Sequence, residues 1–343
     1  MNRSLDSRWT LMWVKVGALC WLVLGLLYLA GNAPFGLIEL LFLLAPLVVV
    51  PLGFELLDGN AQGMRPLALG RVVRVMQPVA AFMAVASFWF PAGRVAGALA
   101  SGWVWVGAVA GWMAVVDLAS GGWRSFNRMV FNVARLDLLI ASCWLLVSRL
   151  GVTPMGFQEP IVLLTGMHFH YAGFAMALIA GITLHGMGGR EGTRGRMLRW
   201  IVALVVFVPY LLAAGFVFSA MLKLVCSLIL AATLLGFAGL QFFSAARFRS
   251  GVARGLLRTA AGLLIPGMLL VIAYAIGEYR GSYWLAIPQM ARVHGPLNGP
   301  GFVLLSLVGW ITEKSYRAQR FQEVVREIDR KSVRVSALRR LSS

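Results

Sequence analysis

The four histidines of the chain fall in or at the ends of two apolar segments. One segment contains the string HFHY, with His168 and His170, and ends near His185; the other contains His294 in the string VHGPLNGPGF. Imidazole binds haem iron and other transition metals, exchanges protons near neutral pH and serves as an acid or base in catalysis. The histidines therefore predict a site for one of these chemistries.

The elements that position these histidines are expected to be membrane-spanning helices. Of 343 residues, 59% are hydrophobic and only 13% are charged, against roughly a quarter charged in soluble domains. A crossing needs about 20 apolar residues. We therefore predict an all-α, polytopic transmembrane helix bundle of about ten helices. The predicted crossings are residues 11–30, 36–55, 72–91, 97–118, 128–149, 160–187, 199–218, 221–243, 256–278 and 286–311, with the turn after 218 the least certain boundary.

The basic residues sort unevenly between the two sides of these crossings. One side receives Arg94, Arg149, Lys223, Arg280 and Arg292, and the other side receives the remaining 26 of the 31 Lys and Arg residues. Since basic loops stay in the cytoplasm, both termini are expected there. The net charge of +18 is then explained by orientation within a lipid bilayer, and no nucleic-acid partner is expected.

Three of the histidines share one predicted depth. His168, His170 and His294 lie eight to ten residues inside helices that run inward, or roughly 12–15 Å at about 1.5 Å per residue. Ionisable groups inside a bilayer are costly and tend to carry function, so the outer half of the membrane is predicted to hold a histidine-lined site. The alternative is that these histidines only hydrogen-bond between helices. His185, near the cytoplasmic end, is expected to be interfacial.

Helix geometry limits what the pair His168 and His170 can bind. Each residue turns about 100°, so the two side chains point about 200° apart and do not easily share one ion. Either one faces His294 and the other faces a second site, or one is structural. The glycines beside the histidines either allow close helix packing or leave room for a flat ligand. Pro296 and Pro300 are expected to disturb the tenth helix and free backbone carbonyls.

Further polar residues complete the predicted site. His168, His170 and His294 are the candidate metal and cofactor ligands, and the same three with Glu39 are the candidate catalytic residues. The candidate substrate-binding residues are Tyr171, Asn298, Arg292 and Glu278. Asp137, near the middle of the fifth crossing, is expected to pair with a basic group.

The domain organisation is simple. Residues 1–311 form the transmembrane domain, and residues 312–343 form a basic amphipathic cytoplasmic tail, with Phe321, Val324, Val325 and Ile328 at helical spacing. Three cysteines in separate apolar runs indicate neither a disulfide framework nor a zinc finger. No nucleotide, protease or hydrolase motif is found.

Two resemblances add to this interpretation. The strings HFHYAGF, HGPLNGPGF and LLAPLVVVPLG resemble the YndJ-like family of bacterial membrane proteins, which implies a multi-pass protein of the bacterial inner (cytoplasmic) membrane. HFHY and HG also resemble haem-ligand helices of the haem–copper oxidases. That likeness implies His168 and His170 as ligands on one helix and His294 opposite, on helices spaced four apart as the second, sixth and tenth are here. The order of the strings is reversed, and the copper-site string is absent.

Three functions stay open at this point. The protein is a cofactor protein that binds haem or a transition metal, a transporter-like protein that binds a small lipophilic or ionic ligand, or an intramembrane enzyme that acts on a lipid or isoprenoid-like substrate by His and Glu acid–base chemistry. A scaffold in which the histidines only pack is the simplest alternative.

Overall fold

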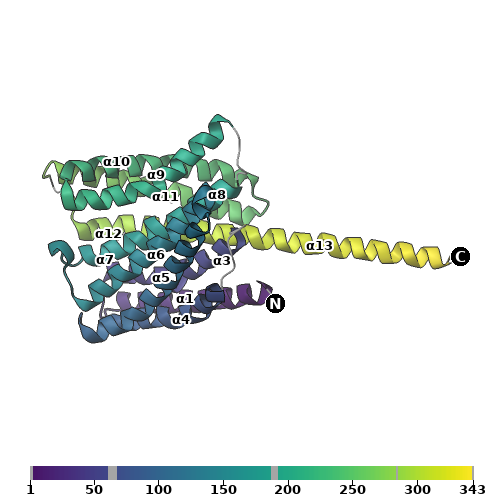
Figure 1. The fold of residues 1–343 in the computed structure, drawn as a ribbon, viewed down its shortest axis with the longest axis horizontal. Helices are drawn as coiled ribbons and strands as arrows, with labels where there is room; N and C mark the ends of the chain where they lie inside the picture. Colours follow the sequence, from purple (N-terminus) through teal and green to yellow (C-terminus); the bar gives the residue numbers. More distant parts are fainter. Residues whose placement is uncertain (1–2, 61–67, 187–191, 283–284, 342–343) are drawn as a thin grey trace.

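The chain folds into a bundle of helices that run side by side (Figure 1), seen in a computed structural model that describes residues 3–60, 68–186, 192–282 and 285–341. These ranges contain no strand. The helices are α1 (Arg3–Leu29), α2 (Leu37–Leu44), α3 (Val50–Asn60), α4 (Ala68–Ser87), α5 (Arg94–Ala119), α6 (Phe126–Leu150), α7 (Ile161–His168), α8 (Met176–Gly186), α9 (Thr193–Phe218), α10 (Ala220–Ser244), α11 (Gly251–Tyr279), α12 (Ile287–Pro296) and α13 (Leu305–Leu341). Three π-helical segments join consecutive helices: η1 (Ala45–Val49), η4 (Phe169–Ala175) and η6 (Leu297–Leu304).

The predicted all-α transmembrane bundle is confirmed. Among the described residues, nine helices are long and apolar enough to cross a membrane, and each coincides with one of the first nine predicted crossings. The tenth predicted crossing consists of α12, η6 and the start of α13, which together pack along α11. The uncertain turn after 218 is a single residue, Ser219, whose hydroxyl accepts a hydrogen bond from the Leu222 amide and caps α10.

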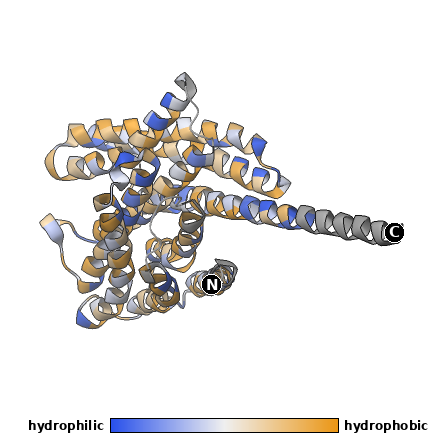
Figure 2. Cartoon of the chain, turned by 45° about the vertical axis from the view of Figure 1, so that its right-hand side comes forward, coloured by the Kyte–Doolittle hydropathy of each residue, from blue (hydrophilic) through white to orange (hydrophobic). Residues whose placement is uncertain are grey.

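The two ends of the chain emerge on one side of the bundle. α1 begins, and α13 leaves the bundle, at the same end (Figure 1). Apolar residues cover most of the bundle, and hydrophilic residues gather toward the helix ends and along the part of α13 that leaves it (Figure 2). Arg65, Arg190 and the side chains beyond Glu323 lie outside what the structure describes, so the apolar face expected at Val324, Val325 and Ile328 stays a prediction.

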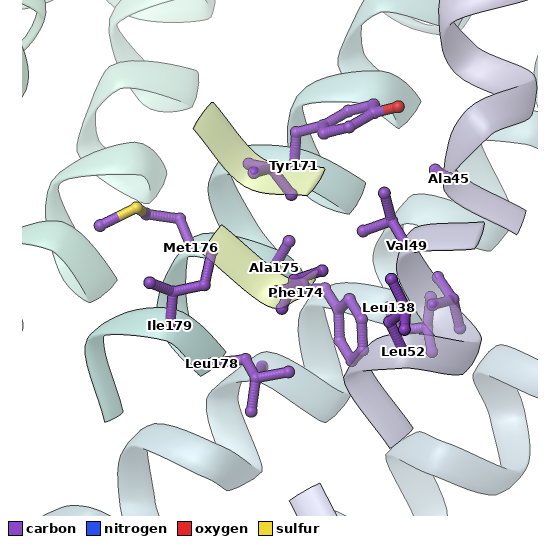
Figure 3. Packing of buried hydrophobic residues seen from close by; sticks show 14 of the residues in the cluster. Ala45, Val49, Leu52, Leu138, Tyr171, Phe174, Ala175, Met176, Leu178 and Ile179 are labelled. Atoms are coloured by element: carbon purple, nitrogen blue, oxygen red, sulfur yellow. The ribbon is translucent and has the colours of Figure 1, made fainter. Parts of the chain in front are cut away.

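The second crossing forms the centre of the molecule. Every residue from 40 to 57 is buried, as expected for a helix that is apolar on all sides. Most residues of α1, in contrast, are not buried. The core around it joins the second, fifth and sixth crossings: Figure 3 shows Val49 and Leu52 near Leu138 of α6 and Phe174 of η4. Close approach is possible because Gly53 lacks a side chain, since a Cβ there would lie 2.6 Å from the Phe174 ring.

The three π-helical segments meet at this centre. η1, η4 and η6 interrupt the second, sixth and tenth crossings respectively, and each contacts the other two. A π-helical turn is rare and often marks a functional position. Proline contributes to two of them, because Pro46 and Pro300 have no amide hydrogen to donate within the helix.

Side chains from neighbouring helices bond the carbonyl groups near Pro46. Each donor comes from a different crossing: Trp21 Nε1 donates to the Leu40 carbonyl at 2.8 Å, the Tyr171 hydroxyl to Leu41 at 2.8 Å and Gln77 Nε2 to Pro46 at 2.7 Å. A bilayer supplies no water to carbonyl groups that a broken helix leaves without partners. The contacts therefore stabilise the break while fixing three helices around it.

Buried acids lie at the end of the bundle where α1 begins. Glu55 accepts a bond from Lys314 Nζ at 2.6 Å, and Asp117 accepts one from Arg128 Nη2 at 2.6 Å. Glu313 of α13 accepts bonds from the amides of Ser250 and Arg249, at 3.0 and 3.1 Å, and from Arg317 Nε at 2.7 Å. Glu313 thus caps α11 and ties α13 to it.

The Glu313 carboxylate is expected to stabilise the bundle in a pH-dependent way. Burial alone would raise the pKa of this carboxyl, but the hydrogen bonds from the Ser250 amide and from Arg317 hold the pKa below its usual range. A lowered pKa in the folded protein means that the unfolded chain binds the proton more tightly. The stabilisation is therefore complete above about pH 4.3, the usual value for glutamate, and is lost as the pH falls through the folded pKa.

We predict that Glu313→Gln lowers the free energy of unfolding by about 1–3 kcal/mol, because an amide group would face two backbone donors with only one acceptor oxygen. Thermal unfolding in detergent at neutral pH measures the change. The matched control is Glu323→Gln: Glu323 is 62% exposed and pairs with the exposed Arg320, so its loss should stay within about 0.5 kcal/mol. Equal effects of the two substitutions would contradict the capping role.

Candidate functional site

His168 ends α7 at the start of η4 and is not covered by its neighbours. Its Nδ1 lies 2.6 Å from the Leu164 carbonyl, one helical turn earlier, and its side chain is exposed. Because a carbonyl only accepts, Nδ1 carries the hydrogen and Nε2 keeps a free lone pair. No described residue bonds that lone pair, so His168 is available as a ligand or a proton acceptor.

His294 lies near the end of α12, and the η6 segment that follows α12 contacts the η4 segment that begins directly after His168. His294 is half-buried, and its Nδ1 lies 2.9 Å from Asn298 Nδ2 and 3.2 Å from the Gly267 carbonyl of α11. Its Nε2 has no hydrogen-bond partner among the described residues. The two imidazole groups therefore lie on neighbouring segments of the sixth and tenth crossings, each with Nδ1 held by the protein.

His170 points elsewhere, as the 200° relation requires. It is fully buried, its Nδ1 donates to the Gly166 carbonyl at 2.8 Å, and its Nε2 accepts from Trp103 Nε1 at 2.9 Å. Its ring lies between Trp103 and Phe42, at centroid distances of 6.1 and 5.1 Å. Both nitrogens are engaged, so His170 connects the second, fourth and sixth crossings.

Neighbouring helices occupy the space beside the glycines near the histidines. A Cβ on Gly295 would lie 2.6 Å from the Leu41 side chain, and one on Gly299 would lie 3.4 Å from the Tyr171 ring. Cβ atoms on Gly166 and Gly173 would similarly meet α6. Of the two predicted explanations, close packing holds at these positions.

Of the other predicted site residues, only Asn298 forms a hydrogen bond with one of the two imidazole rings among the described residues. Glu39 accepts a bond from the Gly36 amide at 3.0 Å and caps α2. Glu278 pairs with Lys223 at 2.9 Å, and Arg292 is exposed on α12. Tyr171 is buried and bonded to Leu41. Within the described ranges, no group of three or more His, Cys, Asp or Glu side chains is placed to hold a metal ion.

Asp137 has a different partner from the one expected. Its carboxyl accepts a hydrogen bond of 2.5 Å from the Tyr210 hydroxyl of α9, and not from a basic group. Gly173 of η4 packs directly against it. Arg135, two residues earlier, points to Asn132, to which it donates at 3.2 Å.

Sequence reasoning did not identify Trp103, Gly267 or Tyr210. Trp103 lies in an apolar run in which tryptophan is a common lipid-facing residue, and only its hydrogen bond to His170 distinguishes it. Gly267 contributes a backbone carbonyl, which no side-chain pattern reveals. The sequence held a signal only for Tyr210, because Asp137 lies inside a predicted crossing and such an aspartate requires a partner.

We predict that the Trp103–His170 hydrogen bond couples the fourth and sixth crossings energetically. In a double-mutant cycle with Trp103→Phe and His170→Leu, the coupling free energy should be about 1 kcal/mol, near the upper range for such bonds in membranes. Thermal unfolding of the four proteins in detergent measures it.

The control for this cycle replaces His170→Leu by His185→Leu. His185 lies half-buried at the far end of α8, so its effect should add to that of Trp103→Phe. If the effects of Trp103→Phe and His170→Leu also simply add, the hydrogen bond contributes nothing to stability.

The comparisons with known proteins agree with this architecture. The chain is 28% identical over 308 residues to a Bacillus subtilis (strain 168) protein described as uncharacterized membrane protein YndJ; the match covers 87% of this chain and 52% of the relative. The chain thus spans about half the length of that relative. No solved structure matches this chain. A family model described as YndJ-like protein matches residues 40–302. Since that match covers most of the chain, from the second crossing to η6, the chain belongs to the YndJ-like family.

Proposed function

We propose that this integral membrane protein binds a small ligand between His168 and His294, in the outer half of the bacterial inner membrane, with both chain ends in the cytoplasm. The observation that carries the proposal is that neither Nε2 atom has a hydrogen-bond partner in the part of the chain that the structure describes. Leaving polar atoms unbonded in an apolar medium costs free energy, and both rings are oriented by bonds at Nδ1. Oriented but unbonded groups are what a ligand site requires.

A transporter-like role is supported by the broken tenth crossing. α12 and α13 are separated by η6, which contains Pro300 and lies beside the pair. Interrupted helices of this kind form the sites of many transporters, because they expose backbone groups next to the ligand. The ligand would be small and either lipophilic or ionic.

A cofactor role is the second candidate. His168 donates Nδ1–H to a backbone carbonyl, the arrangement that orients histidine ligands of metals and haem. Haem iron accepts two axial imidazole ligands, and a metal ion held by two histidines needs further ligands from solvent or substrate. The predicted ligands would then be Nε2 of His168 and Nε2 of His294, with His170 supporting the helix behind them.

The enzyme alternative has less support from the structure. Acid–base chemistry by His and Glu requires a carboxyl group beside an imidazole. Glu39 and Glu278 instead cap a helix and pair with lysine.

The first test is an optical spectrum with elemental analysis and native mass spectrometry of the protein extracted from its own membrane. We expect a bound component, either a metal, a haem or a small molecule, that is absent from His168→Leu/His294→Leu. Removing the component should lower the melting temperature of the wild type only, because a ligand stabilises the state it binds.

His185→Leu is the matched control, since His185 lies at the opposite end of the sixth crossing. It should retain the component. A Soret band or stoichiometric metal would favour the cofactor role, and a colourless bound molecule would favour the transporter-like role. If the wild type and the double variant carry the same components and melt at the same temperature, the proposed site does not bind a ligand.

A further inference from the structure

Nδ1 of His294 has two neighbours that demand opposite states of the ring. The Gly267 carbonyl, at 3.2 Å, can only accept a hydrogen bond, which requires a hydrogen on Nδ1. Asn298 Nδ2, at 2.9 Å, can only donate one, which requires a lone pair on Nδ1. A neutral imidazole can satisfy only one of these two neighbours. The neighbour that Nδ1 bonds therefore decides whether Nε2 of His294 presents a hydrogen or a lone pair to the ligand.

The backbone settles which neighbour prevails. Asn298 Nδ2 also donates to the His294 carbonyl at 2.8 Å. Rotating the amide would place its oxygen against that carbonyl, two acceptors in contact, so the amide nitrogen stays on this side. The second hydrogen of the same nitrogen then points at Nδ1, which must accept it. The carbonyl of His294 therefore fixes the Asn298 amide, and the amide fixes the ring.

Gly267 makes this arrangement possible. A Cβ at this position would lie 2.7 Å from Asn298 Nδ2 and 3.0 Å from Oδ1, so only glycine leaves space for the amide. Asn298 Oδ1 is buried and has no hydrogen-bond partner among the described residues. The chain thus accepts an unsatisfied oxygen, which costs about 1–3 kcal/mol, to direct the amide nitrogen at His294.

We propose that Asn298 is a positioning residue that keeps the proton of His294 on Nε2. The inference rests on the proposed ligand site and specifies its ligand. The hydrogen of the His168 ring lies on Nδ1, which donates to the Leu164 carbonyl, so Nε2 of His168 is an acceptor. Nε2 of His294 carries the hydrogen of its ring and is a donor. The pair therefore recognises an uncharged group that accepts one hydrogen bond and donates another, namely a hydroxyl or an undissociated carboxylic acid. Metal ligation by His294 would require losing the Asn298 bond.

Nitrogen NMR of the full-length protein in lipid nanodiscs tests this proposal, with histidine labelled by nitrogen-15. The four histidines are assigned by His170→Leu, His185→Leu and the single His168 and His294 variants. We expect a protonated Nε2 on His294 and a protonated Nδ1 on His168. In Asn298→Leu the Gly267 carbonyl becomes the remaining partner, and the proton of His294 should move to Nδ1.

Gly267→Ala is the second variant, in case Asn298→Leu fails to fold. The added methyl group displaces the amide without removing it, so the same proton shift is expected. Either variant should bind Co²⁺ about tenfold more tightly than the wild type, because Nε2 of His294 then has a free lone pair. If Asn298 only packs against its neighbours, neither variant should change the tautomer of His294 or the affinity for Co²⁺.

The ligand class is probed with 1-hexanol and its methyl ether, which accepts but does not donate. Hexanol should shift both the His168 and the His294 signals of the wild type, whereas the ether has no hydrogen to donate to His168 Nε2 and should leave the His168 signal unchanged. A protonated Nδ1 on His294 in the wild type, or equal shifts with both probes, would overturn this inference. The ligand site itself is tested separately, by the bound component that His168→Leu/His294→Leu should lack. Failure of this inference and failure of the ligand site can therefore be distinguished.

Discussion

The requirement that backbone polar groups find partners inside the protein governs the centre of this bundle. A bilayer offers no water to a carbonyl freed by proline, and the second, sixth and tenth crossings are all interrupted by π-helical segments. Around Pro46 the freed groups are bonded by Trp21, Tyr171 and Gln77. The irregular segments can exist only because neighbouring helices complete them, and this in turn fixes how those helices pack.

Much of the architecture was predictable because hydropathy in a membrane protein reports crossings directly. Nine predicted crossings match helices, and the tenth was harder because α12 is polar and broken. The grouping of the second, sixth and tenth crossings was implied only by the resemblance to the haem-ligand helices of haem–copper oxidases, which are also spaced four apart. The separation of His168 from His170 followed from the 100° helical step, but which of them faces His294 did not, because Trp103 decides it from a distant part of the chain.

The site itself illustrates the limit of residue type as evidence. Three histidines at one depth suggested three ligands, yet His170 has both nitrogens bonded, whereas His168 and His294 each keep one nitrogen without a partner among the described residues. Glu39 was a candidate catalytic residue and Glu278 a candidate substrate-binding residue, yet Glu39 caps a helix and Glu278 forms an ion pair. Chemical availability depends on what the second nitrogen or oxygen already contacts, and a backbone carbonyl such as that of Gly267 leaves no trace in composition.

The π-helical segment η4 also affects how freely the site can change. A π-helical turn holds about one residue more than an α-helical turn, which rotates the helix before it by roughly 100° relative to the helix after it. Since η4 begins directly after His168, α7 is oriented independently of α8, which is almost wholly buried. The buried α8 can therefore serve as a fixed anchor for α7. A single-residue insertion in a central crossing thus changes the direction of the side chains on one half of that crossing without repacking the other half.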